Sequence, residues 1–341
     1  LFWKLMKSPL AKAVFVMPGN GGIPNTHRIK YIKLSDFAEV LQVINMHAID
    51  LVVVGPEQLL VDGLGDYLAR EAPQVMFFGP SRVAAEIEGS KVFCKELCVK
   101  YGIPSALYRL VTTMDYGKRL IASWEQGKYV IKADGICAGK GVVIPNTYDE
   151  ALAALTDLLV HKKFGKAGER IIIERKLVGK ECSVMALCDG QSIVPMLPAR
   201  DHKRLNAGPD GLNNPNTGGM GAYAPLPDVG VEMRERIRVH ILEPLVRGLS
   251  AEGRPFKGVI FAGIMITDEG PMLLEVNCRF GDPETQTILP LLTSDLLPYL
   301  VACCNGTLRE MEFMKWSEQK YSVCVNKVSG GYPATDFIKG Y

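Results

Sequence analysis

The chain has 341 residues, which permits two or three domains and a sizeable hydrophobic core. Its 39 basic and 37 acidic residues leave a net charge of +2, which excludes a global field that attracts nucleic acid or acidic membrane. Nine cysteines without a CxxC pair favour a reduced, cytoplasmic protein over a disulfide framework or zinc site, and no apolar run approaches the roughly 18 residues that cross a bilayer.

The first 90 residues alternate apolar strands with helices, and the chain begins without methionine, which indicates residues missing upstream. The segment 35–48 has helical spacing and a Ser35 or Asp36 cap. Three stretches read as buried parallel strands that end in glycine-containing loops: 12–17, 49–55 and 74–81. This rhythm predicts a doubly wound α/β unit with ligands at the carboxyl ends of its strands.

The rest of the chain begins with a helical pattern and then becomes richer in patterns typical of β-strands. Helices are predicted over 81–102, 149–160 and 231–253. Strands are predicted over 127–135, 139–145, 169–177, 181–190 and 191–198. The stretches 258–267 and 272–280 predict a hairpin around 268–271, because Asp-Glu-Gly-Pro is turn-forming.

The segment 130–143 (VIKADGICAGKGVV) places glycines and two lysines, Lys132 and Lys140, around a tight turn between two β segments. Glycines let backbone N–H groups approach phosphate oxygens, and lysines add point charges. The segment is neither a Walker loop nor a dinucleotide-binding turn. A mobile hairpin with solvated lysines is the alternative.

Two acids flank the next strand connection. Glu174 ends an apolar strand and Glu181 starts the following one. An adenine needs an apolar slot with a carboxylate or backbone partner, and a ribose needs an acceptor. Glu174 and the backbone near Leu177 suit the first role and Glu181 the second, although two solvent-facing acids would give the same pattern.

The segment 199–225 reads as a long loop, with Asp201, His202, Lys203 and Arg204 in succession. Loops rich in glycine and asparagine are either mobile connections or substrate-binding surfaces. Its run NTGGMGAY places many unhindered N–H groups in a row, which suits anion binding.

Polar residues alternate with apolar ones along 273–280 (LLEVNCRF). Because side chains alternate between the faces of a strand, Glu275, Asn277 and Arg279 would share one face. A carboxylate and an amide are hard oxygen ligands suited to Mg²⁺, and a guanidinium pairs with a phosphoryl group. A solvent-exposed face is the alternative, which the irregular charged segment that follows makes less favourable.

In this order, the clusters resemble the ATP-grasp ligases, and within them the phosphoribosylamine–glycine ligase family. The motifs that carry the resemblance are VVGPE, EGSK (88–91), IKADG…AGKGV (131–142), DHKR (201–204), PNTGGMGAY (215–223), EVNCRFGDPETQ (275–286) and GGYP (330–333). The resemblance implies an α/β fold, α+β in its core: a doubly wound pre-ATP-grasp domain over 1–89, an ATP-grasp domain over 90–325 with a lid at about 110–178, and the start of a C-terminal domain at 326–341. It also implies an ATP-dependent carbon–nitrogen ligase of purine biosynthesis, which joins glycine to 5-phosphoribosylamine through glycyl phosphate.

The resemblance further implies residue roles. ATP would be bound by Lys91, Lys132, Gly139, Lys140, Gly141, Glu174, Leu177 and Glu181. Mg²⁺ or Mn²⁺ would be held by Glu275 and Asn277, and catalysis carried by Arg279, Asp201 and Lys203. The other substrates would be bound by Gly19, Asn20, Pro56, Glu57, Asn216, Thr217, Gly218, Gly219 and Asp282.

The sequence departs from the family pattern at both ends. The family's N-terminal strand and G-N-G-G-R-E-H turn, which helps to hold the sugar phosphate, are missing, as is most of its C-terminal domain. Fusion to further purine-pathway domains is expected for some members of the family. Two other functions stay open: a ligase for another carboxylate, and a nucleotide-binding module that does not turn over.

Overall fold

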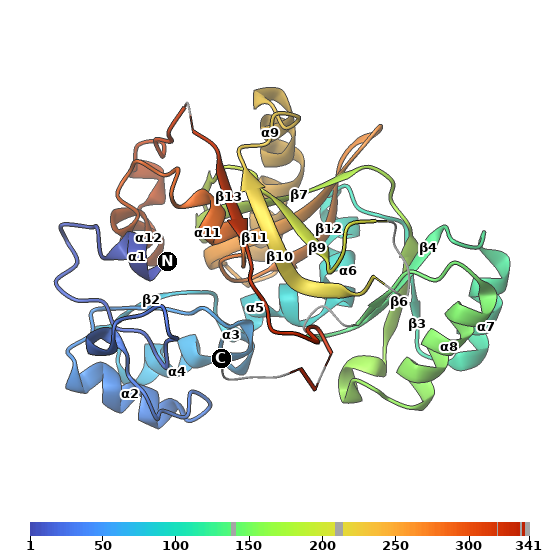
Figure 1. Ribbon diagram of the computed structural model, residues 1–341, viewed down its shortest axis with the longest axis horizontal. Helices are drawn as coiled ribbons and strands as arrows, with labels where there is room; N and C mark the ends of the chain where they lie inside the picture. The colour runs from blue at the N-terminus through green and yellow to red at the C-terminus, as the bar shows by residue number, and fades with distance from the viewer. Residues whose placement is uncertain (138–140, 209–213, 319, 335, 338–341) are drawn as a thin grey trace.

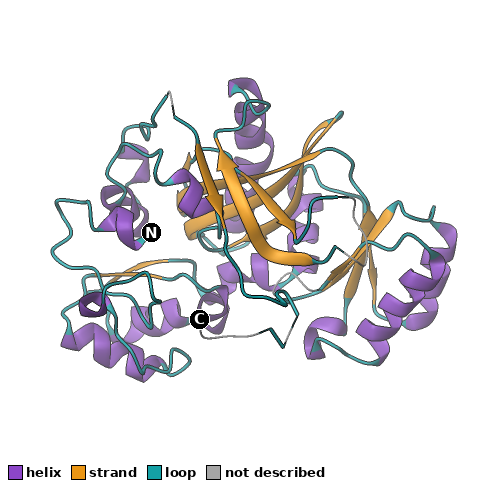
Figure 2. Cartoon of the chain, in the orientation of Figure 1, coloured by secondary structure: helices purple, strands orange, loops and turns teal. Residues whose placement is uncertain are grey.

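The computed structural model describes residues 1–137, 141–208, 214–318, 320–334, 336 and 337. Central antiparallel sheets separate an N-terminal α/β unit from a lid that carries its own sheet and helices (Figures 1 and 2). The predicted mixed α/β class is confirmed. None of the described helices is both long and apolar enough to cross a membrane.

The N-terminal unit contains one parallel strand pair, β1 (Leu51–Val53) with β2 (Met76–Phe78). Its helices are α1 (Phe2–Leu5), α2 (Phe37–Met46), α3 (Glu57–Asp62), α4 (Leu64–Glu71) and α5 (Arg82–Gly89). Asp36 caps α2 by accepting from the Ala38 and Glu39 amides, as its sequence position predicted.

The predicted buried strand over 12–17 is wrong. Only Val16 pairs there, in a single parallel bridge with Arg28, and the segment is exposed or half-buried. Pro18 directly follows Met17 and has no N–H with which to extend the pairing. The apolar segment 12–17 therefore forms an irregular connection rather than a strand.

The central sheet has the order β12–β11–β7–β8, all antiparallel. Its strands are β12 (Gly270–Asn277), β11 (Lys257–Thr267), β7 (Lys180–Asp189) and β8 (Ile193–Pro195). The hairpin predicted over 258–280 is therefore confirmed as β11 and β12. Both faces are covered: Val184 and Ala262 pack in one hydrophobic core, and Met185 and Phe261 pack in another.

The helices α6 (Lys91–Tyr101), α9 (Val231–Ile237), α10 (Glu243–Ala251), α11 (Glu284–Ile288) and α12 (Leu297–Asn305) lie outside the lid. Two predicted continuous helices are interrupted. The helix over 81–102 breaks at Ser90, whose side chain caps α6. The helix over 231–253 contains a π-helical turn, Arg238–Leu242, between α9 and α10.

The lid is a sheet of order β3–β6–β4–β5 with helices on one side (Figure 1). Its elements are β3 (Tyr108–Val111), α7 (Met114–Ser123), β4 (Tyr129–Ala133), β5 (Val142–Val143), α8 (Tyr148–Leu155) and β6 (Ile171–Arg175). Tyr129, Ile131 and Ile173 are fully buried in a separate core, so the lid packs as a unit of its own.

The segment 199–225 is not the long loop that its composition predicted. It forms β9 (Arg200–Arg204) and β10 (Asn216–Ala224), which pair in a sheet of order β13–β10–β9, with β13 (Ser322–Val325) at the other edge. A bridge from Ser183 to Ala199 joins this sheet to β7. Cross-strand pairing thus overrides the turn-forming composition.

Candidate active site

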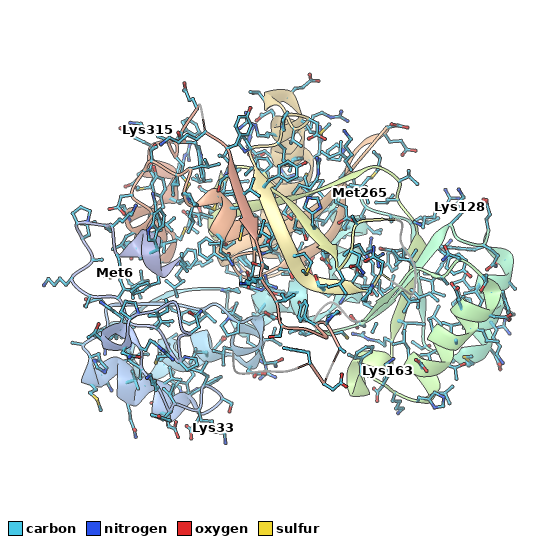
Figure 3. All side chains as sticks on the ribbon, viewed as in Figure 1. Met6, Lys33, Lys128, Lys163, Met265 and Lys315 are labelled. Carbon is cyan, nitrogen blue, oxygen red and sulfur yellow. The ribbon has the colours of Figure 1, made fainter. Side chains whose placement is uncertain are left out.

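Two buried lysines share one buried carboxylate where the lid meets the core. Lys132 on β4 and Lys95 on α6 both pair with Glu174 on β6, and the Lys95 Nζ–Glu174 Oε2 distance is 2.7 Å. All three residues are buried, with exposed fractions of 4% for Lys95, 7% for Lys132 and 2% for Glu174. Ordinary lysines such as Lys128 and Lys163 project from the surface (Figure 3). Burying two lysines with one acid leaves one positive charge in excess, which suits an anionic ligand.

The charges within this group stabilise one another. Burial alone lowers the pKa of Lys132, but attraction to Glu174 and Glu275 outweighs burial and raises it. Burial likewise favours the neutral form of Glu174, but the two lysines hold its pKa below the usual range. Lys132 Nζ also lies 3.5 Å from the Leu274 carbonyl, so this lysine links the lid to β12.

The sheet β12–β11–β7 carries the predicted metal ligands. Register places Glu275 beside Gly263, and Gly263 beside Ser183. Asn277 ends β12, two residues after Glu275, so both oxygen donors lie on one face. β12 ends at Asn277, and Arg279 lies beyond it. The strand alternation from which Arg279 was predicted to share this face therefore does not extend to Arg279.

Lys203 lies among three carboxylates on this face. Its Nζ is 3.6 Å from Glu275 Oε1, 3.8 Å from Asp201 Oδ2 and 3.8 Å from Glu181 Oε2. Burial lowers the pKa of Lys203, but these carboxylates outweigh burial and raise it above its usual range. Lys203 is the main cause that lowers the pKa of Glu275, with Lys132 and Lys91 adding to it, so Glu275 is ionised.

An ionised carboxylate and an amide on one strand face fit a hard divalent cation. Among the described residues, no group of three or more His, Cys, Asp and Glu side chains is arranged to hold a metal. A cation bound at Glu275 and Asn277 would therefore take most of its ligands from water and phosphate, which is how Mg²⁺ is usually bound beside nucleotides.

Arg279 and Glu57 connect the N-terminal unit to this face. Arg279 Nε donates to Glu57 Oε2 at 3.2 Å, and Nη1 donates to the Phe280 carbonyl at 3.2 Å. Pro56 precedes Glu57 at the start of α3. The structure thus brings Arg279 together with one of the predicted substrate-binding residues.

The glycine-rich turn is held against the start of α6. Ser90 Oγ donates to Asp134 Oδ1 at 3.0 Å, and the Val92 amide donates to the same oxygen at 3.1 Å. Lys91 Nζ donates to the Gly135 carbonyl at 2.8 Å. A Cβ at Gly141 would lie 2.7 Å from that of Cys137, so the turn needs a glycine there. Gly139 and Lys140 lie outside the described residues.

The NTGG run is part of β10 rather than a free anion-binding loop. Thr217 Oγ1 donates to the Lys203 carbonyl at 2.9 Å and accepts from the Gly219 amide at 3.0 Å. The Gly218 amide donates to the Tyr332 hydroxyl at 3.0 Å. The run, which begins at Asn216, therefore supports Lys203, and two of its N–H groups are bonded within the protein. Gly219 also packs on Pro283, which follows Asp282.

Other predicted residues lie apart from the cluster. Gly19 and Asn20 occupy an N-terminal turn in which Asn20 Oδ1 accepts from the Gly22 amide, and no described contact links them to Lys203 or Glu275. Leu177 lies in the connection between β6 and β7 and is half-buried.

No role was predicted from the sequence for Lys95, Glu88 or Glu284, although Glu88 and Glu284 lie within the quoted motifs EGSK and EVNCRFGDPETQ. Glu88 Oε2 accepts from the Cys278 amide at 2.6 Å, beside Asn277, and burial raises the pKa of Glu88 to about 7. Lys95 lies one helical turn after Lys91, a spacing that places both side chains on one side of α6.

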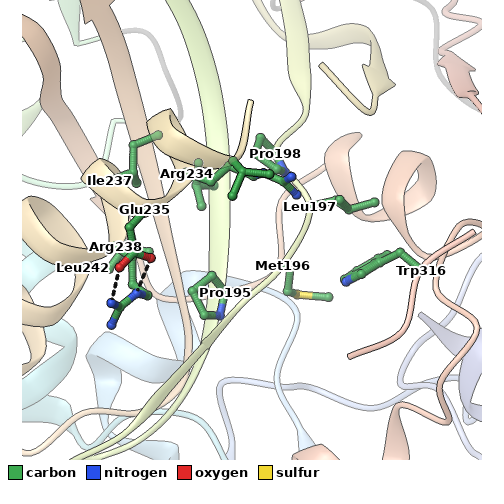
Figure 4. A pocket seen from close by; sticks show the side chains of 12 residues that line it. Pro195, Met196, Leu197, Pro198, Arg234, Glu235, Ile237, Arg238, Leu242 and Trp316 are labelled. Carbon is green, nitrogen blue, oxygen red and sulfur yellow. Dashed lines mark hydrogen bonds and ion pairs between the residues drawn. The ribbon is translucent and has the colours of Figure 1, made fainter. Parts of the chain in front are cut away.

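A cavity of about 310 Å³ lies away from these residues. Its lining includes Met196, Trp316 and the charged residues Arg234, Glu235 and Arg238, and none of the predicted site residues. Arg238 Nε donates to Glu235 Oε2 at 2.9 Å across its wall (Figure 4). The buried lysines and carboxylates described above lie outside this lining, so we place the candidate site at the lysine–carboxylate cluster.

Two family descriptions match the chain: Phosphoribosylglycinamide synthetase, N domain, over residues 1–88, and Phosphoribosylglycinamide synthetase, ATP-grasp (A) domain, over residues 89–285. The chain belongs to the phosphoribosylglycinamide synthetase family. The predicted family is thereby confirmed, whereas the predicted boundaries at 89/90, 110–178 and 325/326 and the residue roles stay predictions.

Relatives of this synthetase family are similar along almost the whole chain. A phosphoribosylamine–glycine ligase of Rhizobium meliloti is 46% identical over 98% of this chain and 77% of its own length. The bifunctional purine biosynthetic protein PUR2,5 of Pichia angusta is 44% identical over 98% of this chain, which spans only 42% of that protein. Fusion to other catalytic domains thus occurs among the relatives.

Solved structures agree with the fold. The phosphoribosylamine–glycine ligase of Thermotoga maritima superposes with a TM-score of 0.75 and 30% identity, over 93% of this chain and 74% of that one. A biotin carboxylase of Campylobacter jejuni gives a TM-score of 0.65 at 14% identity, over 84% of this chain and 61% of that one. The latter likeness concerns the fold alone.

Proposed function

We propose that this chain is an ATP-dependent ligase that joins glycine to 5-phosphoribosylamine, giving glycinamide ribonucleotide, ADP and phosphate. Membership of the synthetase family supports the reaction. In this chain, the observation that supports the reaction is the group of residues around Lys203 and Lys132, where three sheets bring lysines and carboxylates together.

The nucleotide lies between the lid and the core in this proposal. Lys132 and Lys95 carry one positive charge in excess of Glu174 and bind phosphate oxygens. Lys91, at the start of α6, adds a third cation, and Glu181 and the backbone near Leu177 are the candidates for the nucleoside.

Glu275 and Asn277 hold Mg²⁺ or Mn²⁺, which when bound neutralises phosphate charge. The glycine carboxylate attacks the γ-phosphorus of ATP, the bond to the ADP oxygen breaks, and glycyl phosphate forms. Lys203 and Arg279 stabilise the charge that moves onto the transferring phosphoryl oxygens and keep the reactants aligned. The amine nitrogen then attacks the acyl carbon, phosphate leaves, and the nitrogen loses a proton to solvent.

The amine substrate is assigned to the N-terminal side of this face. Glu57 is the predicted substrate residue whose side chain accepts a hydrogen bond from Arg279. Thr217 and Asp282 approach from the β10 side, where Thr217 bonds the backbone of Lys203.

The test is phosphate release from ATP with Mg²⁺, omitting glycine or phosphoribosylamine in turn. Release that requires both supports the proposal. Release with another carboxylic acid in place of glycine would identify a neighbouring ligase, and ATP binding without release would identify a binding module. A Lys33→Met variant is a control, because Lys33 is exposed and distant from the cluster (Figure 3).

A further inference from the structure

Asp134, which directly follows β4 of the lid, is a buried carboxylate with partners in both the lid and the core. The residue is 6% exposed. Within the lid, its Oδ2 pairs with Arg170 Nη2 at 2.6 Å, and its amide donates to the Arg170 carbonyl at 3.0 Å. From the start of α6, Ser90 Oγ donates to Asp134 Oδ1 at 3.0 Å, and the Val92 amide donates to the same oxygen at 3.1 Å. One lid carboxylate therefore accepts two hydrogen bonds from the core.

The start of α6 depends on the lid for one of its hydrogen bonds. The first four N–H groups of an α-helix have no partner within the helix. The Ser90 side chain accepts from the Phe93 amide at 3.1 Å, which satisfies one of these groups. The Val92 amide donates to Asp134 instead. The Asp134 carboxylate also complements the partial positive charge of the helix N-terminus, so separating the lid from α6 would remove stabilising partners from both.

Gly135 allows the lid backbone to come close to α6. Its φ of +118° lies in the region that favours glycine, and a Cβ there would lie 2.8 Å from that of Ala167. The same Cβ would lie 3.8 Å from the carbonyl oxygen of Gly89, which precedes α6. Lys91 Nζ donates to the Gly135 carbonyl at 2.8 Å. The lid thus contacts the start of α6 through its backbone as well as through the Asp134 side chain.

Asp134 connects the two elements whose lysines bind phosphate in the proposed function. Lys132 lies two residues before Asp134, on β4, whereas Lys91 and Lys95 lie on α6. The orientation of β4 against α6 therefore sets the spacing of these cations. Neither Ser90 nor Asp134 is assigned to the nucleotide, so their hydrogen bond does not compete with phosphate for a donor.

We propose that Asp134 is a positioning residue that holds the lid against α6, with Ser90 as its partner in the core. Through this contact it sets the distance of Lys132 from the lysines of α6. This rests on the proposed function, because the spacing of the lysines matters to the reaction only when they bind ATP. Without the contact, ATP binding has to order the lid, so nucleotide affinity falls while turnover at saturating ATP changes little.

The first measurement uses the protein without nucleotide. The Val92 amide has no partner within α6, so its hydrogen exchange, followed by NMR, reports the contact with the lid directly. Exchange should be about 10- to 100-fold faster in Asp134→Ala than in the parent, the range for losing one hydrogen bond to a charged group. Asp149→Ala, which removes an exposed acid of the lid, is the control and should leave the exchange rate unchanged.

The second measurement compares two serines that cap helices. Ser81 caps α5 by accepting from the Ala84 amide, as Ser90 caps α6, but the Ser90 hydroxyl in addition donates to Asp134. Calorimetric titration with ATP and Mg²⁺ should show affinity about tenfold weaker in Ser90→Ala and unchanged in Ser81→Ala. In phosphate-release assays, Asp134→Ala should raise the KM for ATP and leave kcat close to the parent value.

A double-mutant cycle tests whether Ser90 and Asp134 act together. Adding Ser90→Ala to Asp134→Ala should cost little further ATP affinity, whereas Ser81→Ala should show no coupling to Asp134→Ala. Circular dichroism checks that each variant is folded. If Asp134→Ala does not fold, the comparison of Ser90→Ala with Ser81→Ala decides the question.

Three results would overturn the positioning role: unchanged exchange of the Val92 amide in Asp134→Ala, equal ATP affinities of the Ser90 and Ser81 variants, or additive losses from the Ser90 and Asp134 substitutions. A loss in kcat without a rise in KM would also do so, because it would place Asp134 in the chemical step. Failure of the proposed function is distinguishable, because absence of phosphoribosylamine-dependent phosphate release leaves hydrogen exchange and ATP affinity measurable in the same protein.

Discussion

Removing the shared carboxylate of Glu174 should cost more stability than removing either of its lysines. The two lysines and Glu174 together carry one net positive charge, and all three are buried. Glu174→Gln leaves two unneutralised ammonium groups, whereas Lys95→Met leaves the neutral pair Lys132–Glu174. At the 2.7 Å separation of Lys95 and Glu174, Coulomb attraction is about 6 kcal/mol at an effective dielectric constant of about 20, before desolvation.

Breaking a buried pair by removing one partner costs about 3–5 kcal/mol net, so that range is expected for Glu174→Gln. Lys95→Met preserves most of the side-chain volume and should cost less than about 1.5 kcal/mol. Thermal unfolding of the two variants and the parent measures the difference. The midpoint should fall by roughly 6–20 °C for Glu174→Gln, from about 2–4 °C per kcal/mol.

The two variants should rank in the opposite order for ATP affinity, which Lys95→Met should weaken more than Glu174→Gln does. Lys95→Met removes the excess positive charge, so ATP affinity should fall about tenfold or more, the cost of one charged hydrogen bond. Titration with ATP and Mg²⁺ measures it. If Glu174→Gln is no less stable than Lys95→Met, or if Lys95→Met binds ATP like the parent, the charge argument is wrong.

Three other predictions concern the proposed metal ligand Glu275, the half-buried acid Glu88 and the glycine Gly219. Glu275→Gln should lower metal-dependent turnover by roughly 10²–10³ with the fold intact, which initial rates against Mg²⁺ concentration measure; near-parental activity at limiting Mg²⁺ would contradict the metal assignment. Burial raises the pKa of Glu88 to about 7 against the opposing hydrogen bond from Cys278, so its ionisation destabilises the folded state as pH rises from about 4.5 through 7. The free energy of unfolding of Glu88→Gln, relative to that of the parent, should therefore rise by up to about 3 kcal/mol between pH 5 and pH 8. A difference that does not change with pH would refute this. Gly219→Ala should be more destabilising than Gly208→Ala in denaturant unfolding, because both glycines have positive φ but only Gly219 would place a Cβ 2.5 Å from Pro283; equal losses would mean that the φ angle alone matters.

The alternation of polar and apolar residues was enough to predict the strand that carries Glu275 and Asn277. Period-two patterning reports which face a side chain takes: Val276 is buried and Glu275 and Asn277 are half-buried, although a register shift beside Gly263 interrupts the alternation earlier in the strand. The Asp36 cap was predictable for the same reason, because capping depends on residues within one turn. Local rules therefore recovered the elements whose determinants lie close together in the sequence.

Elements that depend on distant partners were not predictable. Helical periodicity alone runs through the break at Ser90, where the side chain caps α6 locally and also donates a hydrogen bond to Asp134 on the lid. β9 and β10 pair with each other and with β13, far away in the chain, although their composition is typical of a loop. The pairing of Lys95, on α6, could not be predicted because its carboxylate, Glu174, lies on β6 of the lid, far away in the chain.

The site thus holds its lysines on carboxylates before any nucleotide binds. Lys132 is paired with Glu174 and lies near the backbone of β12, while Lys203 is divided among three acids. These contacts restrict the lysine side chains, so in the proposed function phosphate oxygens would meet cations that have already lost most of their conformational freedom. If each lysine keeps its acid when a nucleotide binds as proposed, the nucleotide would gain only the excess charge of the cluster, which would moderate its affinity.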